Sequence, residues 1–116
     1  MIEDDHDIRE SILDVLRAEG FLAEGAASSR EAIQALKQSA RKPDLILLDL
    51  RLPGEDGFCF REEQKRDPRI ADIPVVLLSA DTRVREKEGL IGAIDSLKKP
   101  MGIDELLDTV RRTMSA

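Results

Sequence analysis

The chain has 116 residues, of which 41% are hydrophobic and 36% charged, and its formal net charge is −6. This length suits one domain with a single core, and scattered Lys and Arg in an acidic chain exclude a nucleic-acid surface, which requires clustered positive charge. With three Phe and neither Tyr nor Trp, the predicted core is aliphatic.

The single cysteine, Cys59, excludes an internal disulfide and favours a reducing compartment. No apolar stretch reaches the length of a membrane span, and no signal peptide precedes the first acidic residues. We therefore expect a cytoplasmic protein without membrane association and without direct binding of nucleic acid.

The first elements predicted along the chain are two amphipathic helices. Apolar residues at helical spacing over residues 8–16 mark the first helix, and Gly20 follows at a position typical of a helix end. Capping-box spacing over residues 28–31 predicts the start of the second helix. Between the two helices, residues 22–26 form a weak candidate for a strand.

Two continuous aliphatic runs predict the central strands. Residues 45–50 and 75–79 lack helical period and are rich in Leu, Ile and Val, as expected for strands of a parallel sheet that is covered on both faces. A short strand is predicted over residues 95–98. Strands that alternate with helices indicate crossover units, and so a parallel sheet with helices on both faces.

The remaining segments predict helices of unequal quality. Residues 58–65 form a plausible helix, and apolar residues at helical spacing over 103–110 predict a last one. A helix over residues 82–91 has a poor apolar face, so we expect it to be the most mobile. No linker or repeat divides the chain, and one α/β domain is predicted over residues 1–116.

Acidic residues stand at the ends of two predicted strands. Glu3, Asp4 and Asp5 follow the short segment Met1-Ile2, and Asp49 closes the apolar run over 45–50. Ligands of open α/β sheets bind at the carboxyl ends of the strands, where converging carboxylates take up protons or bind a cation. A hard cation held by carboxylate and phosphate oxygens is the Mg²⁺ pattern. Acidic residues at helix starts are also ordinary caps.

Two further predicted strand ends supply complementary groups. Ser79 offers a hydroxyl, and Lys99, directly before Pro100, offers a compact positive charge. Each is ordinary alone, because a serine at a strand end is usually a turn residue and such a lysine is usually solvated. In chain order, the acids, the hydroxyl and the lysine suit an anionic oxyacid bound beside a cation.

With these motifs in place, the chain resembles the receiver domain of two-component response regulators. The resemblance is carried by IEDDHDIRESILDVL, PDLILLDLRLPGEDGF, DIPVVLLSA and LKKP, and it covers essentially the whole chain. It implies a flavodoxin-like three-layer sandwich, with a five-stranded parallel sheet in the order 2-1-3-4-5 and helices on both faces. Only Met1 and Ile2 precede Glu3, so a truncated first strand and weakened metal binding by Glu3 and Asp4 are predicted.

The resemblance also implies a role for each matching residue. Asp49 is the phosphoacceptor, Ser79 hydrogen-bonds the phosphoryl group and Lys99 pairs with it. Ser96 occupies the switch position, where the family commonly has Tyr or Phe, so the usual movement of an aromatic side chain is excluded. The implied ligands of Mg²⁺ are Glu3, Asp4, Asp49 and the backbone carbonyl of Arg51.

The implied function is that of a phosphoacceptor module in a phosphorelay. A histidine kinase or a histidine phosphotransfer protein would donate the phosphoryl group, a downstream protein or an output domain would receive the signal, and a homodimer is compatible with this function. The domain would catalyse only its own phosphorylation and slow dephosphorylation.

Two alternatives stay open. A pseudo-receiver, which acts as a phosphorylation-independent interaction scaffold, is favoured by the short first strand and Ser96 and opposed by the intact Asp49, Ser79 and Lys99. A small phosphohydrolase with a nucleophilic Asp is disfavoured, because Arg51 stands where such enzymes usually carry a second Asp as general acid.

Overall fold

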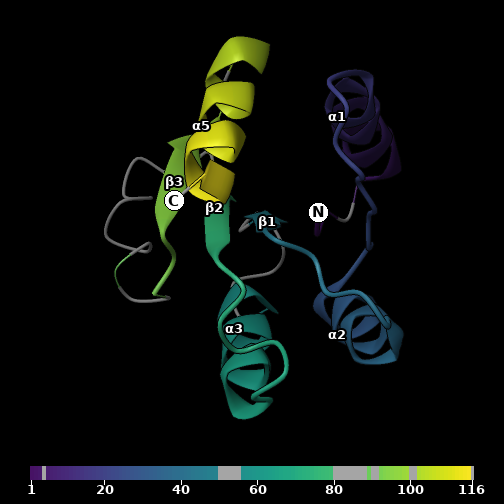
Figure 1. The fold of residues 1–116 in the computed structure, drawn as a ribbon, viewed down its shortest axis with the longest axis vertical. Helices are drawn as coiled ribbons and strands as arrows, with labels where there is room; N and C mark the ends of the chain where they lie inside the picture. Colours follow the sequence, from purple (N-terminus) through teal and green to yellow (C-terminus); the bar gives the residue numbers. More distant parts are fainter. Residues whose placement is uncertain (4, 50–55, 80–88, 90–91, 100–101, 116) are drawn as a thin grey trace.

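Three parallel strands form the centre of the molecule in the computed structural model (Figure 1). They are β1 (Ile46–Asp49), β2 (Val75–Ser79) and β3 (Asp95–Lys98), which neighbour each other in that order. The structure describes all residues except 4, 50–55, 80–88, 90–91, 100–101 and 116. All three strands were predicted, and β1 begins one residue later than expected.

The first three residues extend this sheet through single-residue bridges. Ile2 pairs in parallel with Ala26 on one side and with Leu48 on the other. The backbone bonds that hold it are Ile2 N–H to Leu47 O, Asp49 N–H to Ile2 O, Glu3 N–H to Ala26 O and Ala26 N–H to Met1 O, at 2.8 to 3.0 Å. The truncated first strand is thus confirmed, and it still pairs with both neighbours.

The bridges give the complete order of segments across the sheet. One row of paired residues runs through Ala26, Ile2, Leu48, Leu77 and Ser96. This is the predicted order 2-1-3-4-5, with its first two members reduced to bridges. The strand predicted over residues 22–26 is wrong except at Ala26, and Leu22 is 89% exposed. Before Ala26, the Glu24 carbonyl oxygen accepts a hydrogen bond from the Met1 ammonium at 2.8 Å, but residues 22–25 form no strand.

In the part of the chain that the structure describes, four helices cover the two faces of the sheet (Figure 1). Helices α1 (His6–Ala18) and α5 (Ile103–Ser115) lie on one face, and α2 (Ser29–Gln38) and α3 (Asp56–Arg66) lie on the other. The helix predicted over residues 82–91 lies outside the described residues, apart from Gly89. Among the helices that are described, none is long and apolar enough to cross a membrane.

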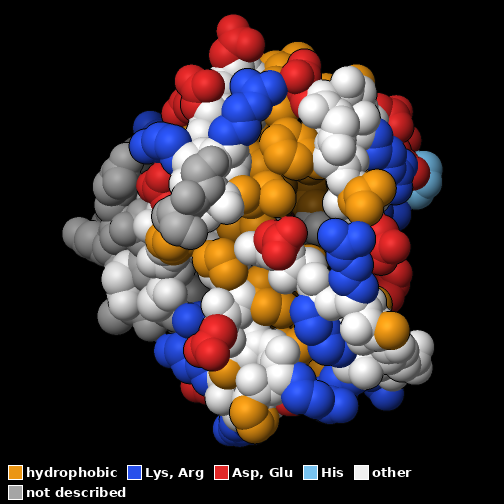
Figure 2. Space-filling model, viewed as in Figure 1, with side chains coloured by type: hydrophobic (Ala, Val, Ile, Leu, Met, Phe, Trp, Pro, Cys, Tyr) orange, Lys and Arg blue, Asp and Glu red, His pale blue; other side chains and the backbone are white. Residues whose placement is uncertain are grey.

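Alternation along the strands divides the aliphatic core into two layers. Leu47, Val76 and Leu78 pack with Leu16 of α1 and with the apolar face of α5. Their neighbours Ile46, Leu48, Val75 and Leu77 pack with Ile33 of α2 and Phe60 of α3. Figure 2 shows hydrophobic side chains reaching the surface between α5 and α1. Both faces of the sheet are buried, as the continuous aliphatic runs predict.

Local signals fix where the helices begin and end. Asp5 caps α1 by accepting a hydrogen bond from the Ile8 N–H at 3.0 Å, and Ser28 caps α2 by accepting one from the Glu31 N–H at 3.2 Å. Gly20, with φ of +91°, follows the end of α1 in the left-handed conformation that favours glycine. Both helix starts therefore follow from short polar side chains at the cap position.

Candidate functional site

The predicted chemical groups meet at the carboxyl edge of the sheet. Asp49 is the last residue of β1, Ser79 is the last residue of β2, and Lys99 directly follows β3. The Lys99 N–H donates to the Ser79 carbonyl oxygen at 2.8 Å, which ties the ends of β2 and β3 together. Asp49 and Ser79 are buried, with 0% and 4% of their surface exposed.

Glu3 joins this group from the bridge segment. Its N–H bonds to Ala26, and its Oε1 accepts a hydrogen bond from the Asp5 N–H at 3.1 Å. The same short turn therefore caps α1 with Asp5 and orients the Glu3 carboxyl. Glu3 is fully buried, so its carboxyl has been taken out of water beside that of Asp49.

Lys99 supplies the compensating charge. Its Nζ lies 2.7 Å from Asp49 Oδ2 and 3.3 Å from Glu3 Oε2, and 17% of its side-chain surface is exposed. Buried carboxylates are costly unless they are paired and hydrogen-bonded. The ammonium group bridges two acids that are 46 positions apart in the sequence, and it thereby makes the acid pair tolerable in the core.

One proton is easily retained at this acid pair. Burial and the hydrogen-bonded Asp49 carboxyl raise the pKa of Glu3 from 4.5 to about 7, against the opposing effects of the Asp5 N–H and the Lys99 ammonium. A raised pKa is expected for a carboxyl group beside a second one, because ionising both brings like charges together. Near neutral pH the site therefore exchanges one proton with solvent.

The donor set suits a hard divalent cation. Glu3 and Asp49 bring carboxylate oxygens together at one buried point, and Mg²⁺ prefers such oxygen ligands. Among the described residues, no group of three or more His, Cys, Asp or Glu could hold a metal ion. Asp4 and Arg51, the other two predicted ligands, lie outside the described residues. The two described acids fit the predicted role, with Lys99 as the charge that a cation would supplement.

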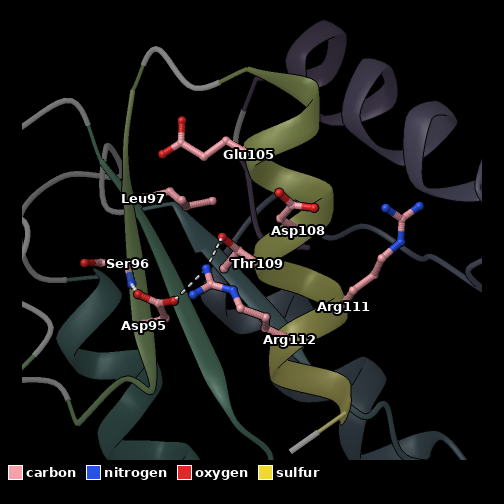
Figure 3. Close-up of a pocket in the computed structure, with 8 residues that line it drawn as sticks. All are labelled: Asp95, Ser96, Leu97, Glu105, Asp108, Thr109, Arg111 and Arg112. Atoms are coloured by element: carbon pink, nitrogen blue, oxygen red, sulfur yellow. Dashed lines mark hydrogen bonds and ion pairs between the residues drawn. The ribbon is translucent and has the colours of Figure 1, made fainter.

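Ser96, the predicted switch residue, lies on β3 and is 4% exposed. Its hydroxyl has no hydrogen-bond partner within the described part of the chain. Figure 3 shows that its side chain points away from α5, whereas Leu97 and Asp95 point toward that helix. Arg112 lies 3.6 Å from Asp95 across a surface pocket of about 340 Å³ between β3 and α5. Ser96 thus belongs to the α3 side of the sheet.

The Ser96→Ala variant should stabilise the protein by about 1 kcal/mol, because it removes a buried hydroxyl that lacks a partner. Chemical denaturation followed by circular dichroism measures this difference. Thr109→Val is the matched control, since it removes a buried hydroxyl that accepts a hydrogen bond from Arg112 at 3.2 Å, and it should lose stability. A clear loss in Ser96→Ala would contradict the absence of a partner.

Sequence reasoning missed one residue beside the site. Arg9 of α1 donates from its NH1 to the Glu3 carbonyl oxygen at 2.8 Å. Its guanidinium is shielded, with 14% of the side chain exposed. The position of Arg9 in the sequence could have indicated this contact. Arg9 lies one turn into a helix that starts directly after the acids, and a long side chain at that position extends back over them.

Comparison with protein families and curated proteins gives one consistent result. The family model for the response regulator receiver domain matches residues 1–111. The chain is 38% identical over 118 residues to the phosphate regulon transcriptional regulatory protein PhoB of Escherichia coli K12, covering 98% of this chain and 50% of that protein. It is 42% identical over 88 residues to the DNA-binding dual master transcriptional regulator RpaA of Synechocystis, covering 71% of this chain and 36% of that protein. The chain therefore spans half or less of these relatives.

Solved structures give the same result for the fold. The chemotaxis response regulator CheY4 of Vibrio cholerae has a TM-score of 0.84 at 26% identity, covering 97% of this chain and 93% of that one. The signal receiver domain of a signal transduction histidine kinase from Syntrophus aciditrophicus also has a TM-score of 0.84, at 31% identity, covering 98% and 86% of the two chains. The flavodoxin-like arrangement inferred from the bridges agrees with these structures.

Proposed function

Because the chain belongs to the response regulator receiver domain family, we propose that residues 1–116 act as a single phosphoacceptor domain in a two-component phosphorelay. Asp49 is the proposed acceptor. One of its carboxylate oxygens attacks the phosphorus of a phosphohistidine on a partner protein, the P–N bond breaks, and the donor imidazole leaves with the bonding electrons. The product is an aspartyl phosphate at the end of β1.

The neighbouring residues have separate tasks in this proposal. Glu3, Asp4 and Asp49, with the carbonyl of Arg51, would hold Mg²⁺, which when bound offsets negative charge on the transferring group. Lys99 pairs with a phosphoryl oxygen once Asp49 is modified, since its Nζ already lies 2.7 Å from the acceptor carboxylate. Ser79 donates its hydroxyl to another of these oxygens. Ser96 leaves the switch position without an aromatic side chain, so we assign the output to movement at Ser79.

The relatives support the partners in this proposal. PhoB and RpaA are named as transcriptional regulators, and this chain matches only part of each. We propose that a histidine kinase or a histidine phosphotransfer protein phosphorylates the domain in the cytoplasm, and that a downstream protein or an attached output domain receives the signal. The domain itself would bind no DNA, and its chemistry would be limited to its own phosphorylation and slow hydrolysis.

One observation carries the proposal. Lys99 reaches two buried carboxylates at the carboxyl edge of the sheet, at 2.7 Å from Asp49 and 3.3 Å from Glu3. A purely structural site gains little from this arrangement, because a buried ion pair is seldom more stabilising than apolar residues of similar volume. A site that must accept an anion next to a cation needs both charges in place. The geometry therefore favours phosphoryl chemistry over a scaffold role.

The test is the intact mass of the protein after incubation with Mg²⁺ and acetyl phosphate as a small phosphodonor. We expect one phosphoryl adduct in the wild type, no adduct after chelation of Mg²⁺, and none in Asp49→Asn, which keeps the shape of the side chain and removes the nucleophilic oxygen. Asp44→Asn is the control, because Asp44 is an exposed acid just before β1. A folded wild type that forms no adduct would support the pseudo-receiver instead.

A further inference from the structure

The backbone of Glu3 is held from two elements. The Glu3 N–H donates to the Ala26 carbonyl at 3.0 Å, in the segment that leads to the cap of α2 at Ser28. The Glu3 carbonyl oxygen accepts a hydrogen bond from Arg9 NH1 of α1 at 2.8 Å.

Close packing limits where the Arg9 side chain can lie. A Cβ atom added at Gly25 would come within 2.8 Å of Arg9 Cδ and 2.8 Å of Leu13 Cδ1. Contacts of that length do not occur between carbon atoms without rearrangement, so the absence of a side chain at residue 25 gives the Arg9 stem its place. Gly25 thus leaves room for the Arg9 stem, and the guanidinium is held by its hydrogen bond to the Glu3 carbonyl.

Both ends of the Glu3 residue are consequently held. Its carboxyl is oriented by the Asp5 N–H and Lys99, while its carbonyl is held by Arg9. The sheet holds this segment through the bridges at Ile2, and the contact from Arg9 is made at the next residue along the chain. A donor from α1 thus adds to the backbone bonds that hold this segment in the sheet.

We propose that Arg9 is a positioning residue for the acidic site, which holds the Glu3 backbone so that its carboxylate remains beside Asp49 for binding Mg²⁺. This inference rests on the proposed function and concerns a residue outside the implied ligand set. The second arginine of α1 offers a matched comparison. Arg17 also donates to a backbone carbonyl, that of Ala23, from Nε at 3.1 Å and NH2 at 2.8 Å. It makes the same type of contact at the opposite end of the helix.

The first measurement is Mg²⁺ affinity by titration calorimetry for wild type, Arg9→Met and Arg17→Met. We expect Arg9→Met to bind Mg²⁺ about tenfold more weakly, the usual size of the effect when a group that orients a ligand is lost. Arg17→Met should match wild type, and the thermal midpoints of the two variants should be similar. Arg9→Lys should recover part of the affinity, since its ammonium still donates a hydrogen bond.

An effect of the Arg9 charge alone would change the Mg²⁺ affinity in the opposite direction. A cation beside the acids repels Mg²⁺, so if Arg9 acts only through its charge, Arg9→Met binds Mg²⁺ more tightly than wild type. Tighter binding, or equal losses in the Arg9 and Arg17 variants, would overturn the positioning role. A loss of about tenfold in Arg9→Met alone would support it.

Amide hydrogen exchange in the metal-free protein gives a second readout that needs neither Mg²⁺ nor phosphorylation. We expect the Glu3 and Asp49 N–H groups, which bond to Ala26 and Ile2, to exchange about tenfold faster in Arg9→Met than in Arg17→Met. Unchanged exchange would overturn the inference even where the wild type forms its phosphoryl adduct. A wild type that neither binds Mg²⁺ nor forms an adduct would contradict the proposed function. In that case the exchange comparison would still decide whether Arg9 holds Glu3.

Discussion

Replacing Lys99 with methionine should destabilise the metal-free protein by about 3 to 5 kcal/mol at neutral pH. The ammonium lies 2.7 Å from Asp49 and 3.3 Å from Glu3, and both acids are fully buried. Methionine keeps most of the length and apolar stem of lysine, so the variant mainly removes the charge. The two carboxyl groups are then left in the core with no ammonium between them. Urea denaturation in the presence of a chelator, followed by circular dichroism, measures the loss.

Lys98→Met is the control for this prediction. Lys98 is the preceding residue, it is exposed, and it belongs to β3. Its replacement should change the stability by no more than about 0.5 kcal/mol, as is usual for surface substitutions. Equal effects of the two variants would show that Lys99 contributes no more than an exposed lysine. The result would then contradict the assignment of Lys99 as the counter-charge of the acid pair.

Stability of the metal-free protein should contain a component that decreases as the pH rises from about 4.5 to about 7. Burial and the Asp49 carboxyl raise the pKa of Glu3 to about 7 in the folded protein, whereas 4.5 applies to the unfolded chain. Between these values the folded state retains a proton that the unfolded state has released, so increasing pH favours unfolding. The component is at most about 3 kcal/mol, because one pKa unit corresponds to about 1.4 kcal/mol.

Glu3→Gln isolates this component, since other acids of the chain titrate in the same range. The amide has the shape of the protonated carboxyl and cannot ionise, so the stability difference between variant and wild type should increase from pH 4.5 to pH 8 in favour of the variant. Unfolding midpoints in urea with a chelator, measured at intervals of pH, give this difference. A constant difference across the range would contradict the raised pKa of Glu3. Mg²⁺ should reverse the ranking at pH 8 by stabilising only the wild type.

Much of the fold follows from the sequence because its signals are local. The continuous aliphatic runs define β1 and β2, and the polar caps Asp5 and Ser28 define where α1 and α2 begin. The irregular course of residues 22–25 does not follow from local pattern, because it depends on contacts with Met1 and with Arg17 of α1. Long-range pairing, not propensity, decides that segment.

Buried polar residues are also difficult to predict from local sequence pattern. Gln64 lies in α3, a helix rich in charged residues, and sequence gives no reason to place it in the core. It is nevertheless fully buried, and its Nε2 donates to the carbonyl oxygens of Ile70 and Ile73, at 2.9 Å each. These bonds support the turn that leads into β2. A glutamine of this kind is identified only when the path of the following loop is known.

The residues of the candidate site were predicted from the sequence, but the contacts between them were not. Glu3, Asp49, Ser79 and Lys99 were expected at one edge because parallel strands share their carboxyl ends. That the lysine bridges both acids depends on side-chain reach and on the tie between the Lys99 N–H and Ser79. The contribution of Arg9 depends on the approach of α1 to Gly25, which no pattern along the chain records.

The single-residue bridges at Ile2 give the molecule two regions with unequal cohesion. β1, β2 and β3 are joined along their full lengths, while within the described residues the segment that carries Glu3 bridges β1 at Ile2. Partial unfolding of the N-terminal segment and α1 would therefore leave the three-stranded sheet intact and separate Glu3 from Asp49. A cation that needs both acids binds only when this region is docked, so ligand occupancy and the local folding of the first helix become one thermodynamically linked equilibrium.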